Sequence, residues 1–173
     1  MVNEKSLNTD MTYSDPSGSF PKKYTDRNLL NYYVERDIAV IKLLQRQSWI
    51  LKTKLVVAGH SEGSAIAAKI AFIYPKVTHL IYSSGNPFER IMSIIERARV
   101  METDTSTYAE DAIKNWEKIV ADSNNTSAKQ GDSYKATYGF SVPSTIDYLL
   151  KLKIPVLVTY GTKDYGLVSF ADY

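Results

Sequence analysis

Residues 54–75 read KLVVAGHSEGSAIAAKIAFIYP, and this stretch is the most informative about the fold. It begins with a short apolar run, KLVVA, which ends at Gly59. Such a run, without polar alternation, is typical of a strand buried on both faces of a parallel sheet. A helical stretch rich in small side chains follows over about residues 62–74, and Pro75 ends it. The stretch therefore predicts a strand, a tight turn and a helix that packs closely on the sheet.

Two further apolar runs have the length and composition of strands. Residues 77–83 read VTHLIYS, and residues 154–160 read IPVLVTY. Earlier in the chain, apolar side chains recur at spacings of three and four from Asp26 to about Gln47, which predicts an amphipathic helix capped by Asp26 or Thr25. This order of helices and strands predicts an α/β fold, in which helices flank a parallel sheet with right-handed crossovers.

A segment of different texture, residues 86–145, separates the second and third predicted strands. It contains amphipathic helical patterns at 91–98 and 112–120 and a polar stretch at 122–133. We expect a helical cap, inserted before the last visible strand and lying over a site. The alternative is a decorated crossover with no catalytic contact. The predicted organisation is then an N-terminal loop (1–25), an incomplete core (26–85 and 146–173) and the cap (86–145).

The composition excludes several classes of function. Lys and Arg number 21 against 19 Asp and Glu, and a net charge of +2 is too balanced for a dedicated nucleic-acid binder. The absence of cysteine excludes disulfide scaffolds, thiolate metal sites and cysteine nucleophiles, and the two histidines fit no metal motif. No apolar segment is long enough to span a bilayer. We therefore expect a soluble protein without a metal, cytoplasmic by default or secreted if a preceding segment carries a signal.

The turn after the first predicted strand carries a nucleophile motif. Residues 59–63, GHSEG, fit the pattern G-x-S-x-G, which becomes specific between a strand and a helix. A sharp turn there forces Ser61 into a strained backbone conformation and raises its hydroxyl at the C-terminal edge of the sheet. Gly59 and Gly63 let strand and helix approach closely, and the N–H of Glu62 points to where an oxyanion would form. The alternative is an ordinary glycine-flanked turn.

With this motif the chain resembles the α/β-hydrolase family, in its serine-nucleophile branch. The resemblance rests on residues 55–63, LVVAGHSEG, and 154–164, IPVLVTYGTKD, and extends over about residues 26–173. The motifs are similar to those of esterase-like, dienelactone-hydrolase-like and prolyl-oligopeptidase-like members and do not separate them. The resemblance implies a partial α/β-hydrolase fold with Asp164 as the acid of a Ser–His–Asp triad, and it implies no cofactor. Glu89 is the alternative acid.

The sequence departs from this family where the triad histidine is expected. The residues after Asp164, YGLVSFADY, include no histidine. His60 is expected to support the turn, because its side chain should diverge from that of Ser61. His79 lies early in the second predicted strand, toward the opposite edge of the sheet. We therefore expect an internal portion of a larger hydrolase, whose catalytic histidine lies beyond Tyr173.

The sequence thus predicts a serine hydrolase that acts on a carboxylic ester, thioester or amide of a small molecule or peptide. Three aromatic side chains in the expected cap, Tyr134, Tyr138 and Phe140, are candidates to line an apolar substrate pocket, although such side chains also simply pack a cap. Two other functions stay open. One is a non-catalytic binding or interaction protein on a hydrolase scaffold, and the other is an acyltransferase. The sequence does not set the oligomeric state.

Overall fold

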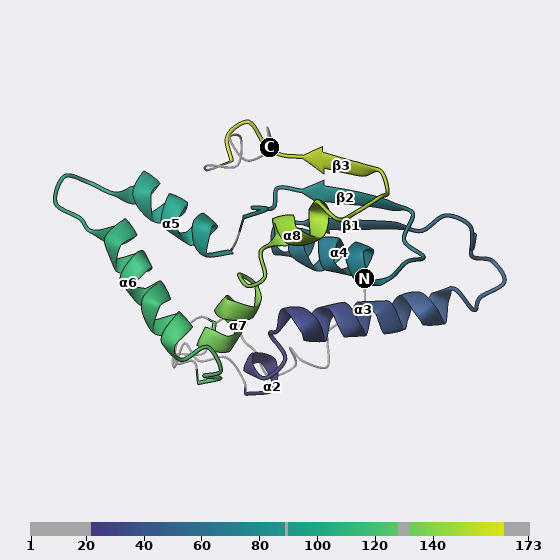
Figure 1. The fold of residues 1–173 in the computed structure, drawn as a ribbon, viewed down its shortest axis with the longest axis horizontal. Helices are drawn as coiled ribbons and strands as arrows, with labels where there is room; N and C mark the ends of the chain where they lie inside the picture. Colours follow the sequence, from purple (N-terminus) through teal and green to yellow (C-terminus); the bar gives the residue numbers. More distant parts are fainter. Residues whose placement is uncertain (1–21, 89, 128–131, 165–173) are drawn as a thin grey trace, which may run out of the picture.

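The computed structural model (Figure 1) describes residues 22–88, 90–127 and 132–164. Within these ranges three strands form one open sheet, in the spatial order β1-β2-β3: β1 (Val56–His60), β2 (His79–Ser83) and β3 (Val156–Thr159). Both neighbouring pairs are parallel. The predicted α/β class with a parallel sheet is therefore confirmed at this level.

The register of the sheet brings the C-terminal ends of the strands to one edge. His60 pairs with Ser83, and Ser83 pairs with Thr159. Each strand therefore enters its following loop at the same place, although up to 76 residues separate the paired positions in sequence (159 − 83 = 76). Ligand sites of open parallel sheets form at this edge, because the loops after the strands meet there.

Helix α4 (Glu62–Ile73) follows β1 and packs on β1 and β2. It ends where the sequence predicts, because Tyr74 precedes Pro75 and takes an extended conformation, with φ −111° and ψ 96°. The predicted small side chains make the contact with the sheet, since Ala67 and Ala68 are buried. The buried core that forms around this contact contains Leu30, Val34, Ala67, Ala68, Ile70, Ala71, Tyr74, Val77, Leu80, Tyr82 and Phe140.

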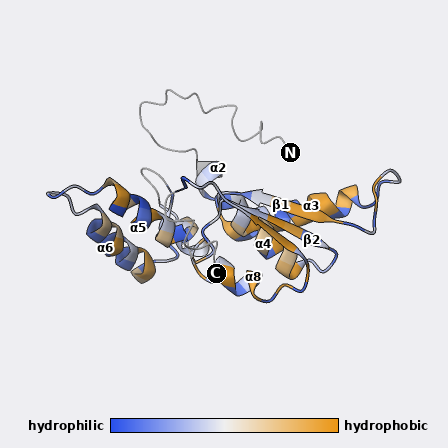
Figure 2. Ribbon diagram, turned by 90° about the horizontal axis from the view of Figure 1, so that it is seen from above, coloured by the Kyte–Doolittle hydropathy of each residue, from blue (hydrophilic) through white to orange (hydrophobic). Residues whose placement is uncertain are grey.

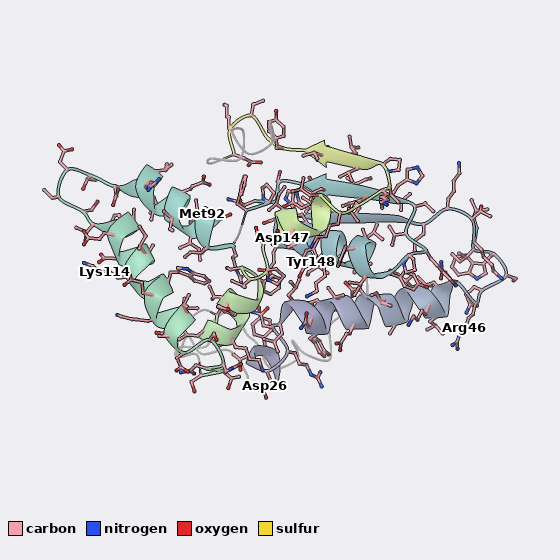
Figure 3. All side chains as sticks on the ribbon, viewed as in Figure 1. Asp26, Arg46, Met92, Lys114, Asp147 and Tyr148 are labelled. Carbon is pink, nitrogen blue, oxygen red and sulfur yellow. The ribbon has the colours of Figure 1, made fainter. Side chains whose placement is uncertain are left out.

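Helices α3 (Leu30–Leu44) and α8 (Thr145–Leu149) flank α4 and complete one layer. Figure 3 labels Tyr148 of α8 beside α4, where its ring lies 5.3 Å from that of Phe72. The amphipathic helix predicted from Asp26 begins later, at Leu30, since the turn before it is closed by hydrogen bonds to the Tyr24 carbonyl.

The start of α3 corrects two details of the prediction. A short helix, α2 (Lys22–Thr25), occupies the end of the segment predicted to be loop. The N-cap of α3 is the apolar Leu29, which forms no side-chain cap, so neither predicted cap residue fills that position. The N–H of Asn28 donates instead to the Tyr24 carbonyl at 2.8 Å, and this bond places a turn between the two helices.

The prediction that the first strand is buried on both faces is wrong for the described residues. Burial alternates along β1: Val57 is half-buried on the α4 side, whereas Val56 and Ala58 point to the other face and are exposed. On β3, Leu157 is likewise 56% exposed. The reason is that the helices packed on the sheet form a single layer on one of its faces.

The region between β2 and β3 is helical, as predicted. Helices α5 (Arg90–Met101) and α6 (Tyr108–Ala121) form a pair that projects from the sheet (Figures 1 and 2). They pack on each other through a small cluster of their own, made of Ile91, Ile95 and Ala109. Figure 2 shows more hydrophilic residues in this pair than in the strands and α4. The short α7 (Tyr134–Gly139) joins the pair to the rest of the molecule by contacts with α6 and α3.

Candidate active site

Ser61 occupies the turn between β1 and α4 with a backbone φ of 53° and ψ of −123°. A positive φ is rare for residues other than glycine and costs on the order of 1–3 kcal/mol, so the surrounding bonds must enforce it. The Ser61 N–H donates to the Ser83 carbonyl at 2.9 Å, and the Ser64 N–H donates to the Ser61 carbonyl at 3.0 Å. The strained turn that the sequence predicts at Ser61 is therefore present.

The two glycines of the motif have different roles. A Cβ at Gly59 would lie 2.0 Å from the Gly63 carbonyl oxygen, so only glycine fits there without a backbone shift. A Cβ at Gly63 would meet nothing within 4 Å. The expectation that both glycines permit the close approach is therefore right for Gly59 and wrong for Gly63, whose carbonyl group is what Gly59 must avoid.

A cavity of about 490 Å³ opens beside Ser61, between the strand ends and α5. The turn and the strand-end loops contribute one wall, formed by His60, Ser61, Glu62, Ala65, Ser84, Asn86 and Asp164. Helix α5 contributes Arg90, Ser93, Ile94 and Arg97, and the remaining wall is formed by Phe140 and Thr145. The cavity therefore lies at the boundary between the sheet and the projecting helices.

Asp164 lines this cavity together with Ser61, although 103 residues separate them in sequence (164 − 61 = 103). Its Oδ2 accepts two hydrogen bonds, from the Gly161 N–H and from the Ser84 hydroxyl, each at 2.9 Å. The Gly161 N–H, followed by Ser84, lowers the pKa of the Asp164 carboxyl below its ordinary value. The side chain is therefore held as a carboxylate, and its Oδ1 makes no hydrogen bond within the described residues.

The N–H of Glu62 lies at the first position of α4, where a helix supplies no acceptor for it. This N–H follows the strained serine directly, which is the position the sequence predicts for an oxyanion donor. The Glu62 side chain turns to α5, and its Oε2 lies 2.6 Å from Arg90 Nη2.

Arg90, the first residue of α5, connects three parts of the molecule. Besides Glu62, its Nη2 contacts Asp132 Oδ2 at 2.6 Å. Asp132 also accepts a hydrogen bond from the amide of Asn28, which is buried just before α3. The Arg90 guanidinium lies 4.9 Å from the ring centroid of Phe140. This cluster ties the base of the projecting helices to the serine turn.

Neither histidine hydrogen-bonds to Ser61. His60 lines the cavity, but its Nδ1 lies 3.2 Å from Ser83 Oγ, as suits a residue that supports the turn. His79 pairs with Val56 at the start of β1, five residues before Ser61, which places it about 16 Å away along the strand. The described part of the chain therefore holds no imidazole in contact with the Ser61 hydroxyl.

Of the three aromatic side chains predicted to line a pocket, only Phe140 lines this cavity. Tyr138 instead stacks on Trp116, with ring centroids 6.0 Å apart and planes 18° from parallel, so it fixes α7 on α6. Tyr134 is also absent from the cavity wall. Neither tyrosine therefore contributes to this cavity. The alternative acid, Glu89, lies outside the described residues.

Sequence reasoning missed the residues that only the fold brings to the cavity. Ser84 has a positive φ of 46° directly after β2, and its hydroxyl holds Asp164. Arg90 and Arg97 belong to none of the sequence motifs that mark a site. Their spacing of seven residues, with Ser93 and Ile94 between them, places all four on one helical face. That spacing is the feature of the sequence from which a shared polar face of this helix could have been predicted.

No protein-family model matches the chain, and no curated protein matches it. Within the described ranges, no group of three or more His, Asp or Glu side chains is placed to hold a metal ion. In the same part of the chain, no helix has both the length and the apolar character that a membrane crossing requires.

Proposed function

We propose that this protein is a serine hydrolase that acts on a carboxylic ester, thioester or amide through an acyl-enzyme. The observation that carries the proposal is the strained conformation of Ser61, with φ 53°, at the wall of a cavity that Asp164 also lines. Strain of this kind persists only when the structure enforces it, and it is common at functional sites. The resemblance of residues 55–63 and 154–164 to α/β-hydrolases supports the same function.

In the proposed reaction Ser61 Oγ attacks the carbonyl carbon of the substrate and forms a bond to it. The hydroxyl proton passes to a base, and the carbonyl oxygen becomes an oxyanion that accepts a hydrogen bond from the Glu62 N–H. Collapse of this intermediate expels the alcohol, thiol or amine, which takes the proton. Water then attacks the acyl-enzyme and releases a carboxylic acid and free Ser61.

Asp164 has the environment that a triad acid requires. Its Oδ2 is occupied by Gly161 and Ser84, so the carboxylate is fixed in direction, and its Oδ1 is left for a further donor. In the proposal Oδ1 accepts the N–H of an imidazole and holds the ring toward Ser61. In the structure His60 Nδ1 lies 3.2 Å from Ser83 Oγ and His79 Nδ1 lies 2.9 Å from Thr78 Oγ1, so the proposed reaction needs an imidazole that these contacts do not supply.

Chemical rescue tests this proposal on the chain as it is. A serine without its base reacts slowly, so a fluorophosphonate probe should label Ser61 weakly, and added free imidazole should increase the rate at least tenfold. Ser61→Ala should abolish the labelling, as measured by intact-protein and peptide mass spectrometry. Ser93→Ala is the matched control, because Ser93 is an exposed serine on the wall of the same cavity and should leave the labelling unchanged. Equal labelling of the Ser61→Ala chain would overturn the proposal.

A second candidate function is a binding protein that keeps a hydrolase scaffold without catalysis. The specific observation in its favour is that no imidazole contacts Ser61 within the described residues. This candidate predicts no labelling of Ser61 at any imidazole concentration, together with ligand binding in the cavity. The rescue experiment therefore separates the two functions.

A further inference from the structure

Helix α5 presents one continuous face to the cavity. Arg90, Ser93, Ile94 and Arg97 all line it, and their spacing of three, four and seven residues places them along one side of the helix. Seven residues correspond to about 10 Å along the helix axis, so Arg97 lies two turns from Arg90. The cavity wall formed by α5 therefore carries a cation at each end.

The two arginines differ in their partners. Arg90 is neutralised within the protein, since its Nη2 contacts both Glu62 and Asp132 at 2.6 Å. Arg97 makes no ion pair or hydrogen bond with any described residue and is exposed at the cavity wall. Its planar guanidinium therefore keeps its donors free for a ligand, in the geometry that binds a carboxylate through two parallel hydrogen bonds.

The charges on the wall are separated in space. The end next to Ser61 carries the Asp164 and Glu62 carboxylates, of which Glu62 is paired with Arg90. An anionic group would be repelled by Asp164 at this end, whereas Arg97 attracts it at the other. A neutral carbonyl can occupy the serine end, since its charge develops only at the oxyanion. The wall thus favours a ligand that is neutral at one end and anionic at the other.

We infer that the substrates of this site are acyl compounds that carry a carboxylate at the end remote from the reacting carbonyl, and that Arg97 binds this carboxylate. A half-ester or half-amide of a dicarboxylic acid has this chemistry. The inference rests on the proposed hydrolase function, because that function places the reacting carbonyl at Ser61. Arg97 acts here as a specificity-determining residue and takes no part in the chemistry of the serine.

Ligand binding tests the inference independently of catalysis. We choose two probes of nearly equal shape: glutaramate, which has one amide and one carboxylate end, and glutaramide, in which both ends are amides. Their affinities are measured by NMR titration of the chain. A charge-assisted hydrogen bond favours the carboxylate, so glutaramate should bind about tenfold more tightly than glutaramide. Because Arg97 is exposed, this preference should shrink as salt is added.

Arg97→Gln should remove the preference for glutaramate and leave the affinity for glutaramide unchanged. Arg99→Gln is the matched control. It removes the same charge from the same helix, at an exposed residue outside the cavity wall, and should keep the preference within about twofold. Equal binding of the two probes by the unmutated chain, or a preference that survives in Arg97→Gln, would overturn the inference.

The labelling experiment tests the hydrolase proposal and the binding experiment tests the carboxylate site, so either can be contradicted without the other. If imidazole-dependent labelling of Ser61 is found but glutaramate is not preferred, the hydrolase proposal stands and the carboxylate site is wrong. If Arg97 sets a preference for glutaramate but Ser61 is never labelled, the hydrolase proposal is wrong, and with it the assignment of that ligand as a substrate. An Arg97-dependent preference together with Ser61 labelling supports both.

Discussion

The sheet with its helical layer and the projecting pair α5–α6 are built in different ways. The core cluster on the sheet gathers buried side chains from α3, α4 and β2, together with Phe140 just after α7, and at its centre Ala68 and Leu80 are 0% and 1% exposed. The cluster of the projecting pair has only three buried members, Ile91, Ile95 and Ala109. Because burial of apolar area is the main stabilising term, the core should be far more stable than the pair.

This difference in packing separates the residues of the candidate site into two groups. Ser61, Glu62 and Asp164 belong to the strand ends, which the large core holds in place, whereas Arg97 belongs to the weakly packed pair. Reaction chemistry requires geometry fixed to within about half an ångström, and recognition of a ligand end tolerates more movement. The well-packed part therefore holds the proposed chemistry, and the weakly packed part is free to set specificity.

The largest expected effect is at the contact between strand and helix. Gly59→Ala would place Cβ 2.0 Å from the Gly63 carbonyl oxygen, so we expect a loss of more than about 3 kcal/mol in the free energy of unfolding. Gly63→Ala is the control, since its Cβ meets nothing and alanine favours a helix by about 1 kcal/mol. Chemical denaturation of both variants measures the change in the free energy of unfolding. Equal effects would show that the turn is not rigid.

The next test compares the two clusters directly. Leu80→Ala should lower the free energy of unfolding of the whole chain by about 2–5 kcal/mol, because the side chain is 1% exposed at the centre of the core. Ile95→Ala should act locally, with faster amide hydrogen exchange in α5 and α6 and unchanged protection in α4. Uniformly faster exchange in the Ile95 variant would mean that pair and core unfold together.

A smaller effect is expected from Tyr82 at alkaline pH. Burial raises the pKa of Tyr82 to about 12, and the neighbouring Ser64 hydroxyl offsets only part of this rise. Above the ordinary tyrosine pKa of about 10 the unfolded chain loses this proton while the folded chain keeps it, so stability falls as pH rises. The loss from this group should reach about 2 kcal/mol at pH 12. Denaturation series at pH 9 to 12 should show a shallower decline for Tyr82→Phe than for the unmutated chain.

The smallest effect on stability is expected at Arg90, where the pair meets the core. Arg90→Gln removes the contacts to Glu62 and Asp132, and because the guanidinium is partly exposed the cost should be about 1 kcal/mol. The rate of amide hydrogen exchange should rise more in α5 than in α4. Arg99→Gln, in an exposed position of the same helix, should leave exchange unchanged. A large global loss in the Arg90 variant would contradict the division into two regions.

The serine turn could be predicted from sequence because its causes are local. The run of residues 55–58 specifies a strand, Gly59 permits contact with the helix, and Pro75 ends that helix, all within a few neighbouring positions. The parallel sheet followed from the same logic, since helices alternate with strands. The boundaries of α3 were predicted less well, because the hydrogen bonds of the preceding turn, rather than a side-chain cap, set its start.

What lies around Ser61 was decided by tertiary structure. Contact between Ser84 and Asp164 spans 80 residues and arises because parallel strands end at one edge of the sheet. The exposure of Val56 depends on which face the helices cover, and a periodic pattern within one strand does not contain that choice. Likewise, seven-residue spacing placed Arg90 and Arg97 on one helical face, but only the fold brought that face and the serine turn to the same cavity. Local sequence thus determined the strained turn, whereas long-range packing determined what surrounds it.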